Sequence, residues 1–170
     1  PSSPQVLYFQ LGDPASAFPD IRVRRAFSMA IDRDSIKKAV WNDDAEPQYH
    51  VHLSLGKWAL HQNELPPDTA QWYKYDPAAA KKLLEASGFA DRQFKLLYIV
   101  PFQGPEYVKV SLAVANMLSS AGIKIVPVQI DYTKDFFGAG KGIRYGNYDK
   151  DSVICTGISA LDDVDEFMFN

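Results

Sequence analysis

Residues 94–130 read FKLLYIV PFQGP EYVKVSLAVANMLSSAG IKIVPVQI, and this stretch decides the fold. The apolar run at 94–100 predicts a strand, and the proline-bounded loop at 101–105 opens a helix that Gly122 ends. Residues 123–130 predict a second strand. Strand, helix and strand at this spacing predict a βαβ unit with parallel strands and a right-handed crossover. Most of the helix circumference is expected to be covered, because its polar residues form one narrow stripe: Glu106, Lys109, Asn116 and Ser120.

Two further strands are predicted outside this unit. Gln5 to Leu11 is aromatic and β-branched enough for a strand, which breaks at the turn signal Gly12-Asp13-Pro14. Residues 152–156 predict another strand, after a short helix around 133–137 and a glycine-rich loop. We therefore expect an α/β fold with an open sheet, forming one domain over residues 1–170.

Helix signals precede the βαβ unit. Asp20 is placed to cap a helix, and a second helical stretch runs through Ile36 and Val40. Asp76-Pro77 is a cap followed by proline at the first helical position, and Gly88 supplies a left-handed stop. The first helix is expected to bury one stripe, because its apolar residues recur at helical spacing: Val23, Ala26, Phe27, Ala30 and Ile31.

Residues 45–71 show no clean period. The segment holds three prolines and all three histidines, together with Tyr49 and Trp58. We interpret it as a long irregular segment that lies over the domain, because loops of this length are usually functional or disordered and its aromatic residues argue against disorder.

The bulk composition excludes several classes of function. The formal net charge is −3, and the basic residues are scattered, so the chain has no electrostatic footprint for nucleic acid. One cysteine rules out an internal disulfide. No apolar run approaches the roughly 20 residues that span a bilayer, and the first residues do not show the basic-then-apolar pattern of a leader. For an exported protein, we expect the signal to lie outside this sequence.

Several residue patterns suggest chemistry, and each has a simpler interpretation. The glycines at 138–142 lack P-loop spacing and fit a flexible surface turn. His50 and His52 could hold a metal, but surface or packed histidines are favoured. Cys155, in an apolar strand, fits an inert buried thiol. The acidic run at 162–166 could hold a cation or a carboxylate pair, but a helix cap at Asp162 or Asp163 is favoured.

The chain therefore shows no pattern that supports catalysis. Serine, histidine and aspartate all occur, but none lies in a nucleophile-elbow context. We expect no enzyme, no cofactor and no metal.

The open sheet predicts where a ligand binds. Ligands of such sheets lie outside the carboxyl ends of the strands. Three stretches qualify, at 101–105, 131–134 and 156–163, although each could merely connect two elements. The side chains in them that offer stacking surface or hydrogen bonds are Phe102, Gln103, Tyr132, Ser159 and Asp162.

Several ordered motifs carry a resemblance to a known family. Residues 19–33, PDIRVRRAFSMAIDR, resemble a segment of the family 5 bacterial extracellular solute-binding proteins. These are the oligopeptide-, dipeptide- and nickel-binding components of ABC importers. The likeness covers nearly the whole chain, since it returns in shorter stretches: AEP at 45–47, YDP at 75–77, AKKLL at 80–84, ASGF at 86–89, AGIKI at 121–125, YD at 148–149 and TG at 156–157.

The resemblance implies a lobe rather than a whole binding protein. Members have two lobes that close over the ligand, and this chain is similar to the first part of the second, C-terminal lobe. The implied fold is a class II periplasmic binding protein-like lobe. We expect an excised or truncated domain whose partner lobe is missing.

The implied function is non-catalytic solute capture for an ABC importer. The implied partners are a small-molecule or oligopeptide solute and the membrane permease subunits, with no nucleic acid and a monomeric state. The implied location is periplasmic or extracellular, with a lipid anchor open for the full-length protein.

One departure from the family pattern affects the ligand. In dipeptide-binding members, an acidic residue after the Thr-Gly-like turn resembles the anchor for the ligand's α-amino group. Here Ile158 follows that turn, and the nearest acids are Asp162 and Asp163. Either Asp162 reaches back, or the protein does not read a free N-terminus and takes oligosaccharides, opines or other solutes.

Two rival functions remain open from the sequence. Some transcription regulators carry the same fold behind a DNA-binding domain, so the lobe could be a ligand sensor; the sequence upstream would discriminate. The second is a small α/β enzyme, which activity or a metal at His50 and His52 would support.

Overall fold

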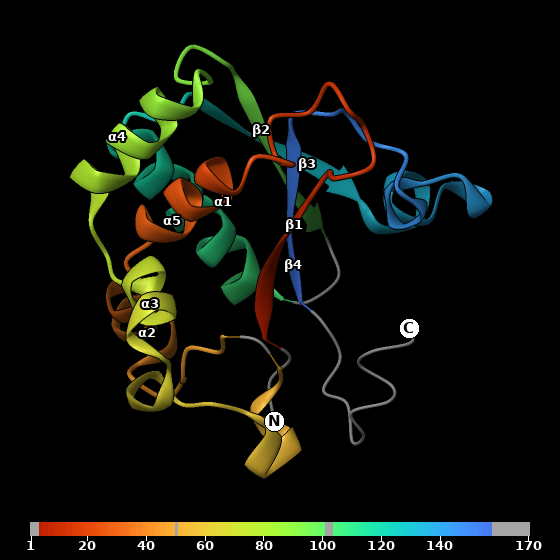
Figure 1. Ribbon diagram of the computed structural model, residues 1–170. Helices are drawn as coiled ribbons and strands as arrows, with labels where there is room; N and C mark the ends of the chain where they lie inside the picture. Colours follow the sequence, from red (N-terminus) through yellow and green to blue (C-terminus); the bar gives the residue numbers. More distant parts are fainter. Residues whose placement is uncertain (1–3, 50, 101–103, 158–170) are drawn as a thin grey trace.

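The computed structural model describes residues 4–49, 51–100 and 104–157, which form a four-stranded sheet flanked by helices (Figure 1). The strands are β1 (Gln5–Phe9), β2 (Phe94–Val100), β3 (Ile125–Asp131) and β4 (Ser152–Gly157), in the order β1-β4-β2-β3. Strand β2 pairs in parallel with both β3 and β4, whereas β1 pairs antiparallel with β4. The expected α/β fold with an open sheet is confirmed.

The βαβ unit lies where the sequence places it. Helix α5 (Pro105–Ser120) connects β2 to β3, and β2 has the bounds that the apolar run predicts. Gly104 and Gly122 flank the helix at φ values of 91° and 87°, which glycine adopts at little cost. The parallel register runs from Phe94 opposite Ile125 to Val100 opposite Asp131.

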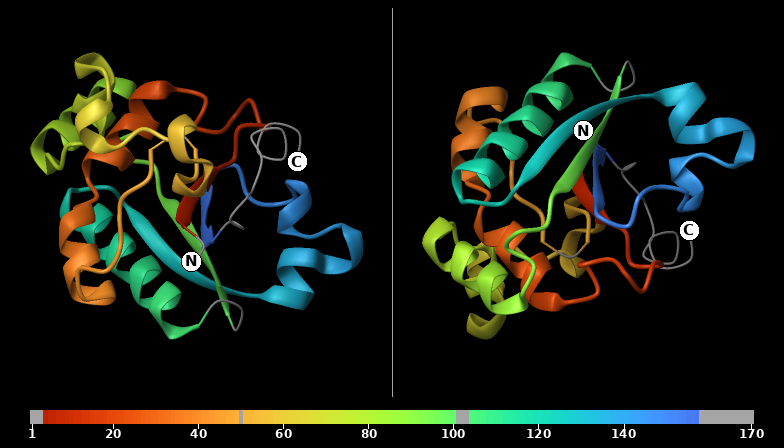
Figure 2. Two further views of the ribbon diagram at one scale, coloured as in Figure 1. Left: turned by 90° about the horizontal axis from the view of Figure 1, so that it is seen from below. Right: turned by 90° about the horizontal axis from the view of Figure 1, so that it is seen from above.

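The helices gather on one face of the sheet, as both views in Figure 2 show. Helix α1 (Ile21–Met29) packs against α4 (Pro77–Ser87), and α5 packs on β2, β3 and β4. Four phenylalanines from β1, α1, β2 and the turn before α1 pack in the centre through tilted and edge-to-face contacts, with ring centroids 4.9–5.7 Å apart. The expected α1 stripe is buried, with exposures from 0% to 7%: Val23, Ala26, Phe27, Ala30 and Ile31.

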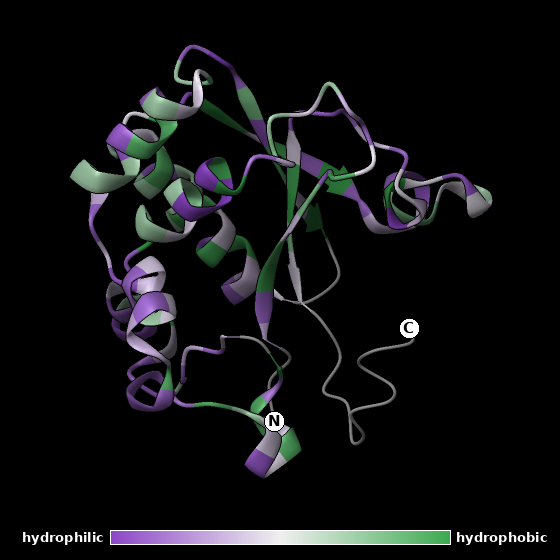
Figure 3. Cartoon of the chain, viewed as in Figure 1, coloured by the Kyte–Doolittle hydropathy of each residue, from purple (hydrophilic) through white to green (hydrophobic). Residues whose placement is uncertain are grey.

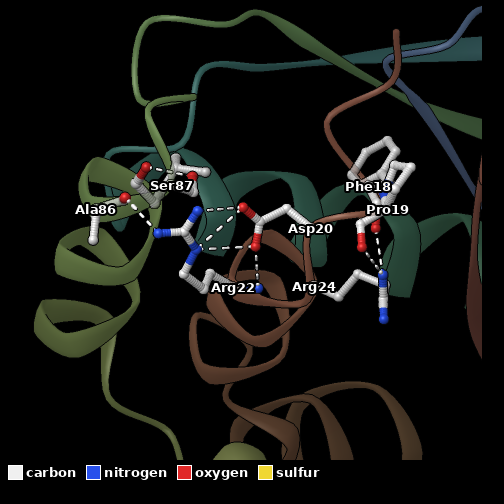
Figure 4. A network of polar contacts seen from close by, with 8 residues as sticks. Phe18, Pro19, Asp20, Arg22, Arg24, Ala86 and Ser87 are labelled. Carbon is white, nitrogen blue, oxygen red and sulfur yellow. Dashed lines mark hydrogen bonds and ion pairs between the residues drawn. The ribbon is translucent and has the colours of Figure 1, made fainter. Parts of the chain in front are cut away.

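Polar contacts at the start of α1 explain its arginine-rich sequence (Figure 4). The Asp20 carboxylate accepts the Arg22 backbone N–H at 2.8 Å, which caps the helix as expected. The Arg22 guanidinium pairs with Asp20 and donates to the Ala86 carbonyl at 2.8 Å, which links α1 to α4. Arg24 donates to the Pro19 carbonyl at 3.1 Å. Two of these arginines therefore act structurally.

Helix α2 (Arg33–Trp41) follows at the periphery and buries no residue. It ends at Asn42, which adopts the left-handed conformation at φ 49°, in agreement with the sequence signal. Hydrophilic colours dominate α2 in Figure 3, whereas hydrophobic colours dominate β1.

Residues 45–71 are more regular than the sequence predicts. The segment contains short helical pieces, namely η1 (Leu53–Trp58), which is kinked at Gly56, η2 (Gln62–Glu64) and α3 (Pro67–Ala70), and η3 (Gln71–Tyr73) follows directly. Turns this short are too brief to show a helical period in the sequence. They are fixed by local contacts instead, such as the His61 N–H that donates to the Glu64 carboxylate at 2.8 Å.

The second face of the sheet is covered by the segment after β3. This segment carries a single π-helical turn, η4 (Tyr132–Phe137), then η5 (Gly138–Gly140) and η6 (Ile143–Tyr145), and it extends away from the sheet in Figure 1. The helix expected around 133–137 is therefore present. Apolar side chains of the segment after β3, such as Phe136 and Ile143, pack on a small second core on this face of the sheet, made of Leu97, Ile99, Ile130 and Ile154.

Strand β1 is shorter than expected. It ends at Phe9 rather than Leu11, because the Gln10 side-chain amide donates to the Gly146 carbonyl at 2.8 Å and its side-chain oxygen accepts the Gly12 N–H at 2.9 Å. These side-chain bonds replace a strand ladder. None of the helices within the described residues is long and apolar enough to cross a bilayer.

Candidate functional site

Three strands end at the same edge of the sheet. Strands β2, β3 and β4 are parallel, so Val100, Asp131 and Gly157 are the last residues of neighbouring strands at one boundary. We call this boundary the carboxyl edge. Gln5, the first residue of the antiparallel strand β1, lies opposite Gly157 and joins it. The expectation that the segments after 100, 130 and 156 start from a common edge is confirmed.

One of the five predicted ligand contacts lies within the described residues. Tyr132 is half-buried at the start of η4, where its ring stacks on Phe136 at 5.9 Å and meets Phe137 edge-on at 5.0 Å. It therefore belongs to the aromatic cluster over the second core, and its role in binding stays a prediction. The other four predicted contacts lie outside the described residues: Phe102, Gln103, Ser159 and Asp162. Ile158 and the acidic run at 162–166 also lie outside them.

Asp131 fixes the backbone from which Tyr132 projects. One carboxylate oxygen accepts the N–H groups of Thr133 at 2.8 Å and Lys134 at 2.7 Å, while the Asp131 N–H donates to Asp135 at 2.9 Å. These bonds satisfy donors that a helix start leaves unpaired. An aspartate directly after a predicted strand and before a predicted helix is the sequence signal for this cap.

Gln5 links β1 to α5 and β4 beside the carboxyl edge, a role that the sequence did not predict. Its side-chain amide donates to the Tyr107 carbonyl at 2.9 Å, to the Ser111 hydroxyl at 2.8 Å and to the Cys155 sulfur at 3.2 Å. The side-chain oxygen of Gln5 is buried and has no partner among the described residues. The sequence signal for this role was a polar glutamine on the same face of the strand as the core-facing Leu7 and Phe9.

Cys155 is a buried thiol, as the sequence indicates. Its side chain is 3% exposed, and burial raises the pKa of the thiol to about 11. Hydrogen bonds with Ser111 and Gln5 act in the opposite direction but are the smaller influence. A reactive cysteine requires a lowered pKa and access, and Cys155 has neither.

The histidines do not assemble a metal centre within the described part of the chain. His52 is buried, and its Nδ1 accepts the Ser54 N–H at 3.0 Å. His61 pairs with Glu46 at 2.5 Å, and this hydrogen bond raises the pKa of the imidazole. Outside residues 1–3, 50, 101–103 and 158–170, no three histidine, cysteine or acidic side chains are grouped for a metal ion. His50 lies among those excluded residues.

The glycine-rich loop forms a turn rather than a phosphate cradle. It follows η4 and not a strand, which a P-loop would require. A Cβ atom on Gly142 would lie 2.3 Å from the Phe136 carbonyl oxygen, so the close return of the chain requires glycine there. The turn interpretation of this loop agrees with the structure.

The sequence profile of the bacterial extracellular solute-binding proteins, family 5 Middle, matches residues 1–168. The chain belongs to this family. A candidate ABC transporter peptide-binding protein of Brucella ovis is 28% identical over 128 residues, which cover 74% of the chain and 23% of that relative. The chain thus spans about a quarter of the length of the curated relatives it matches.

Solved structures show that the fold is that of the family. NikZ of Campylobacter jejuni, in complex with Ni(L-His), superposes with a TM-score of 0.70 at 20% identity, over 97% of this chain and 31% of that one. The periplasmic binding protein DppA of Helicobacter pylori, in complex with the peptide STSA, gives 0.69 at 20% identity, over 96% and 28%. The expectation of a periplasmic binding protein-like fold is confirmed.

Proposed function

We propose that this chain is one lobe, part of the C-terminal lobe, of an extracytoplasmic solute-binding protein that delivers its solute to an ABC importer. Two observations support the proposal: the family match over residues 1–168 and the common carboxyl edge of three parallel strands. The mechanism is capture without bond making. A second lobe closes over the solute by a hinge motion, and the closed form docks on the permease subunits.

The solute lies at the carboxyl edge in this proposal. Its contacts come from the segments that leave this edge, with Tyr132 offering ring surface and the Asp131 cap holding the Tyr132 backbone in place. The remaining proposed contacts are the predicted side chains outside the described residues: Phe102, Gln103, Ser159 and Asp162.

Peptides or related solutes are the proposed class. The two solved structures described above contain a peptide and a nickel chelate. This chain has Ile158 after the Thr-Gly turn, where the resemblance to dipeptide-binding members would place an acidic residue. A peptide solute would place its α-amino group on Asp162, because a charge-assisted hydrogen bond in a closed cleft discriminates strongly. An oligosaccharide would leave Asp162 without that role.

The test is to identify what the full-length protein carries. The protein is purified under native conditions, and the solute is released and identified by mass spectrometry. Tyr132→Ala is expected to weaken rebinding by about tenfold through lost ring contact, with Tyr75→Ala, another partly exposed tyrosine, as the control. An equal loss in both variants, or a chemically converted solute, would contradict capture at this edge.

Asp162 receives its own comparison. If peptides are recovered, Asp162→Asn is expected to weaken their binding by at least about tenfold, because the amine loses its charged partner. Recovery of sugars, or peptide binding that is unchanged in Asp162→Asn, would refute Asp162 as the amine anchor.

A further inference from the structure

A cavity lies beside β1, outside the described segments that leave the carboxyl edge. Its volume is about 860 Å³, within the range of small-molecule pockets. Its walls come from β1, α1, α2, α3, η3, residues 45–49 and Leu53, with Val110, Val114 and Cys155 of α5 and β4 also lining it. In Figure 1, α2 lies at the lower left, whereas β1 and β4 lie near the centre. None of the described residues at 104–105, 131–134 or 156–157 lines this cavity.

Much of the lining suits an apolar, ring-containing body. Aromatic side chains enter from four separate segments, and aliphatic ones from β1, α1, α2 and α5 complete the wall. Flat ring surfaces bury a large area and stack on planar groups. The aromatic residues are Phe9, Trp41, Tyr49, Trp72 and Tyr73.

The charged groups in the lining are mainly cationic. Four basic residues line the cavity against two acidic ones, Glu46 and Asp68, which leaves a formal excess of two positive charges. Glu46 is engaged by His61, so its charge is partly offset. The basic residues are Arg24, Arg25, Arg33 and Lys37. An anionic ligand would therefore be favoured over a cationic one.

Among the described residues that line the cavity, Arg25 is the cation available to receive an anion. Its guanidinium carbon lies 3.9 Å from the centroid of the Trp72 ring, and it forms no hydrogen bond or ion pair with any described residue. Stacking occupies the flat face of a guanidinium and leaves the N–H groups in its plane available. Such a fork binds a carboxylate or sulfonate through two parallel hydrogen bonds.

Arg33 adds a buried positive charge, and no carboxylate of the described residues pairs with it. Its guanidinium donates to the Ser28 carbonyl at 3.1 Å, the Ser28 hydroxyl at 3.0 Å and the Tyr73 carbonyl at 3.4 Å, all uncharged acceptors. Burial lowers the pKa of Arg33, but an arginine side chain stays protonated in proteins. Arg24 and Lys37 are already engaged, by backbone carbonyls and by Asp43 respectively.

We infer that this cavity binds a small organic anion with an apolar, ring-sized body, whose acidic group pairs with Arg25. The cavity shares Gln5 with the carboxyl edge but none of the described residues in the segments that leave that edge, so the inference does not depend on the function proposed for those segments. The two sites are distinguishable, because Arg25, Trp41 and Trp72 line the cavity whereas Tyr132 does not.

A pair of dyes that differ in their acidic group tests the inference on this 170-residue chain. The probes are 8-anilinonaphthalene-1-sulfonate and the neutral N-phenyl-1-naphthylamine, followed by fluorescence. Arg25→Gln is expected to weaken sulfonate binding by about tenfold and to change binding of the neutral dye by less than about twofold. The matched control is Arg144→Gln, which removes an exposed arginine outside the cavity and should leave both affinities unchanged.

The three tryptophans locate the bound dye. Trp41 and Trp72 line the cavity, whereas Trp58 is 58% exposed and lies outside it. The indole N–H resonances of Trp41 and Trp72 are expected to shift on saturation with the sulfonate, while that of Trp58 stays in place. The inference is overturned if no saturable binding occurs, if Arg25→Gln weakens both dyes equally, or if Trp58 alone responds. A urea midpoint for each variant shows that the variant is folded.

Discussion

Replacing Gln5 with alanine should lower the free energy of unfolding by about 1–2 kcal/mol. The Gln5 amide makes two good hydrogen bonds, to the Tyr107 carbonyl at 2.9 Å and the Ser111 hydroxyl at 2.8 Å, and a weaker one to sulfur. Each good bond contributes about 0.5–1.5 kcal/mol net, and removal of the unpaired side-chain oxygen returns part of the loss. The assay is urea unfolding followed by far-UV circular dichroism, with an unchanged denaturant slope as the sign that only stability moved.

Gln129 supplies a matched control, since it is an exposed glutamine on the edge strand β3. Gln129→Ala is expected to change stability by less than about 0.5 kcal/mol. A double-mutant cycle between Gln5→Ala and Ser111→Ala should give a coupling of about 1 kcal/mol, because the two side chains share a hydrogen bond. The reasoning is refuted if Gln5→Ala matches Gln129→Ala, or if the effects of Gln5→Ala and Ser111→Ala simply add.

Three further predictions concern titration and capping. The pKa of His61 is raised, first by the hydrogen bond to the Glu46 carboxylate, so the contribution of His61 to stability is present below about pH 6.5 and is lost as the pH rises through the folded value. An NMR titration should place the His61 midpoint above about 6.5, and Glu46→Gln should return it toward that value; a midpoint that ignores Glu46→Gln contradicts the pairing. Cys155, with its pKa raised to about 11, should react with a disulfide reagent at pH 8 only as fast as the protein unfolds, and rapid labelling of the native protein would disprove its burial. Asp20→Ala should lower the free energy of unfolding by about 1 kcal/mol in urea, while Asp20→Asn retains most of the cap; equal losses in both variants would argue against capping. Because hydrogen bonds from Arg22 lower the Asp20 pKa, the contribution of Asp20 to stability is lost as the pH falls below about 3.9.

The elements with strong local signals were predictable from the sequence. Strand β2 has the predicted bounds, because an apolar run between turn residues leaves little choice, and Gly88 ends α4 in the left-handed conformation that the signal implies. The pairing of β1 was not predictable, because an antiparallel partner far along the chain is chosen by tertiary packing. The short helical pieces at 53–73 were not predicted because they are too short to show a helical period in the sequence.

The candidate site was predictable as a place but only partly as chemistry. Parallel strands must end at one edge, so the positions of Val100 and Asp131 follow from the βαβ pattern alone. The role of Gln5 could not be read in the same way, because its three acceptors lie more than a hundred residues away. The cavity beside β1 was likewise not predictable from the sequence, since its lining residues are spread between positions 4 and 155.

The most direct test of solute capture is an amide-resolved NMR titration of this chain with a short peptide such as Ser-Thr-Ser-Ala. The account predicts shifts at the carboxyl edge, around Val100, Asp131 and Gly157, while the opposite ends of the strands at Phe94 and Ser152 stay in place. The affinity of the lone chain should be weaker than about 100 µM, because half of a cleft cannot bury most of a ligand's surface. Shifts centred on Phe94 and Ser152, or sub-micromolar binding by this chain alone, would contradict capture between two closing lobes.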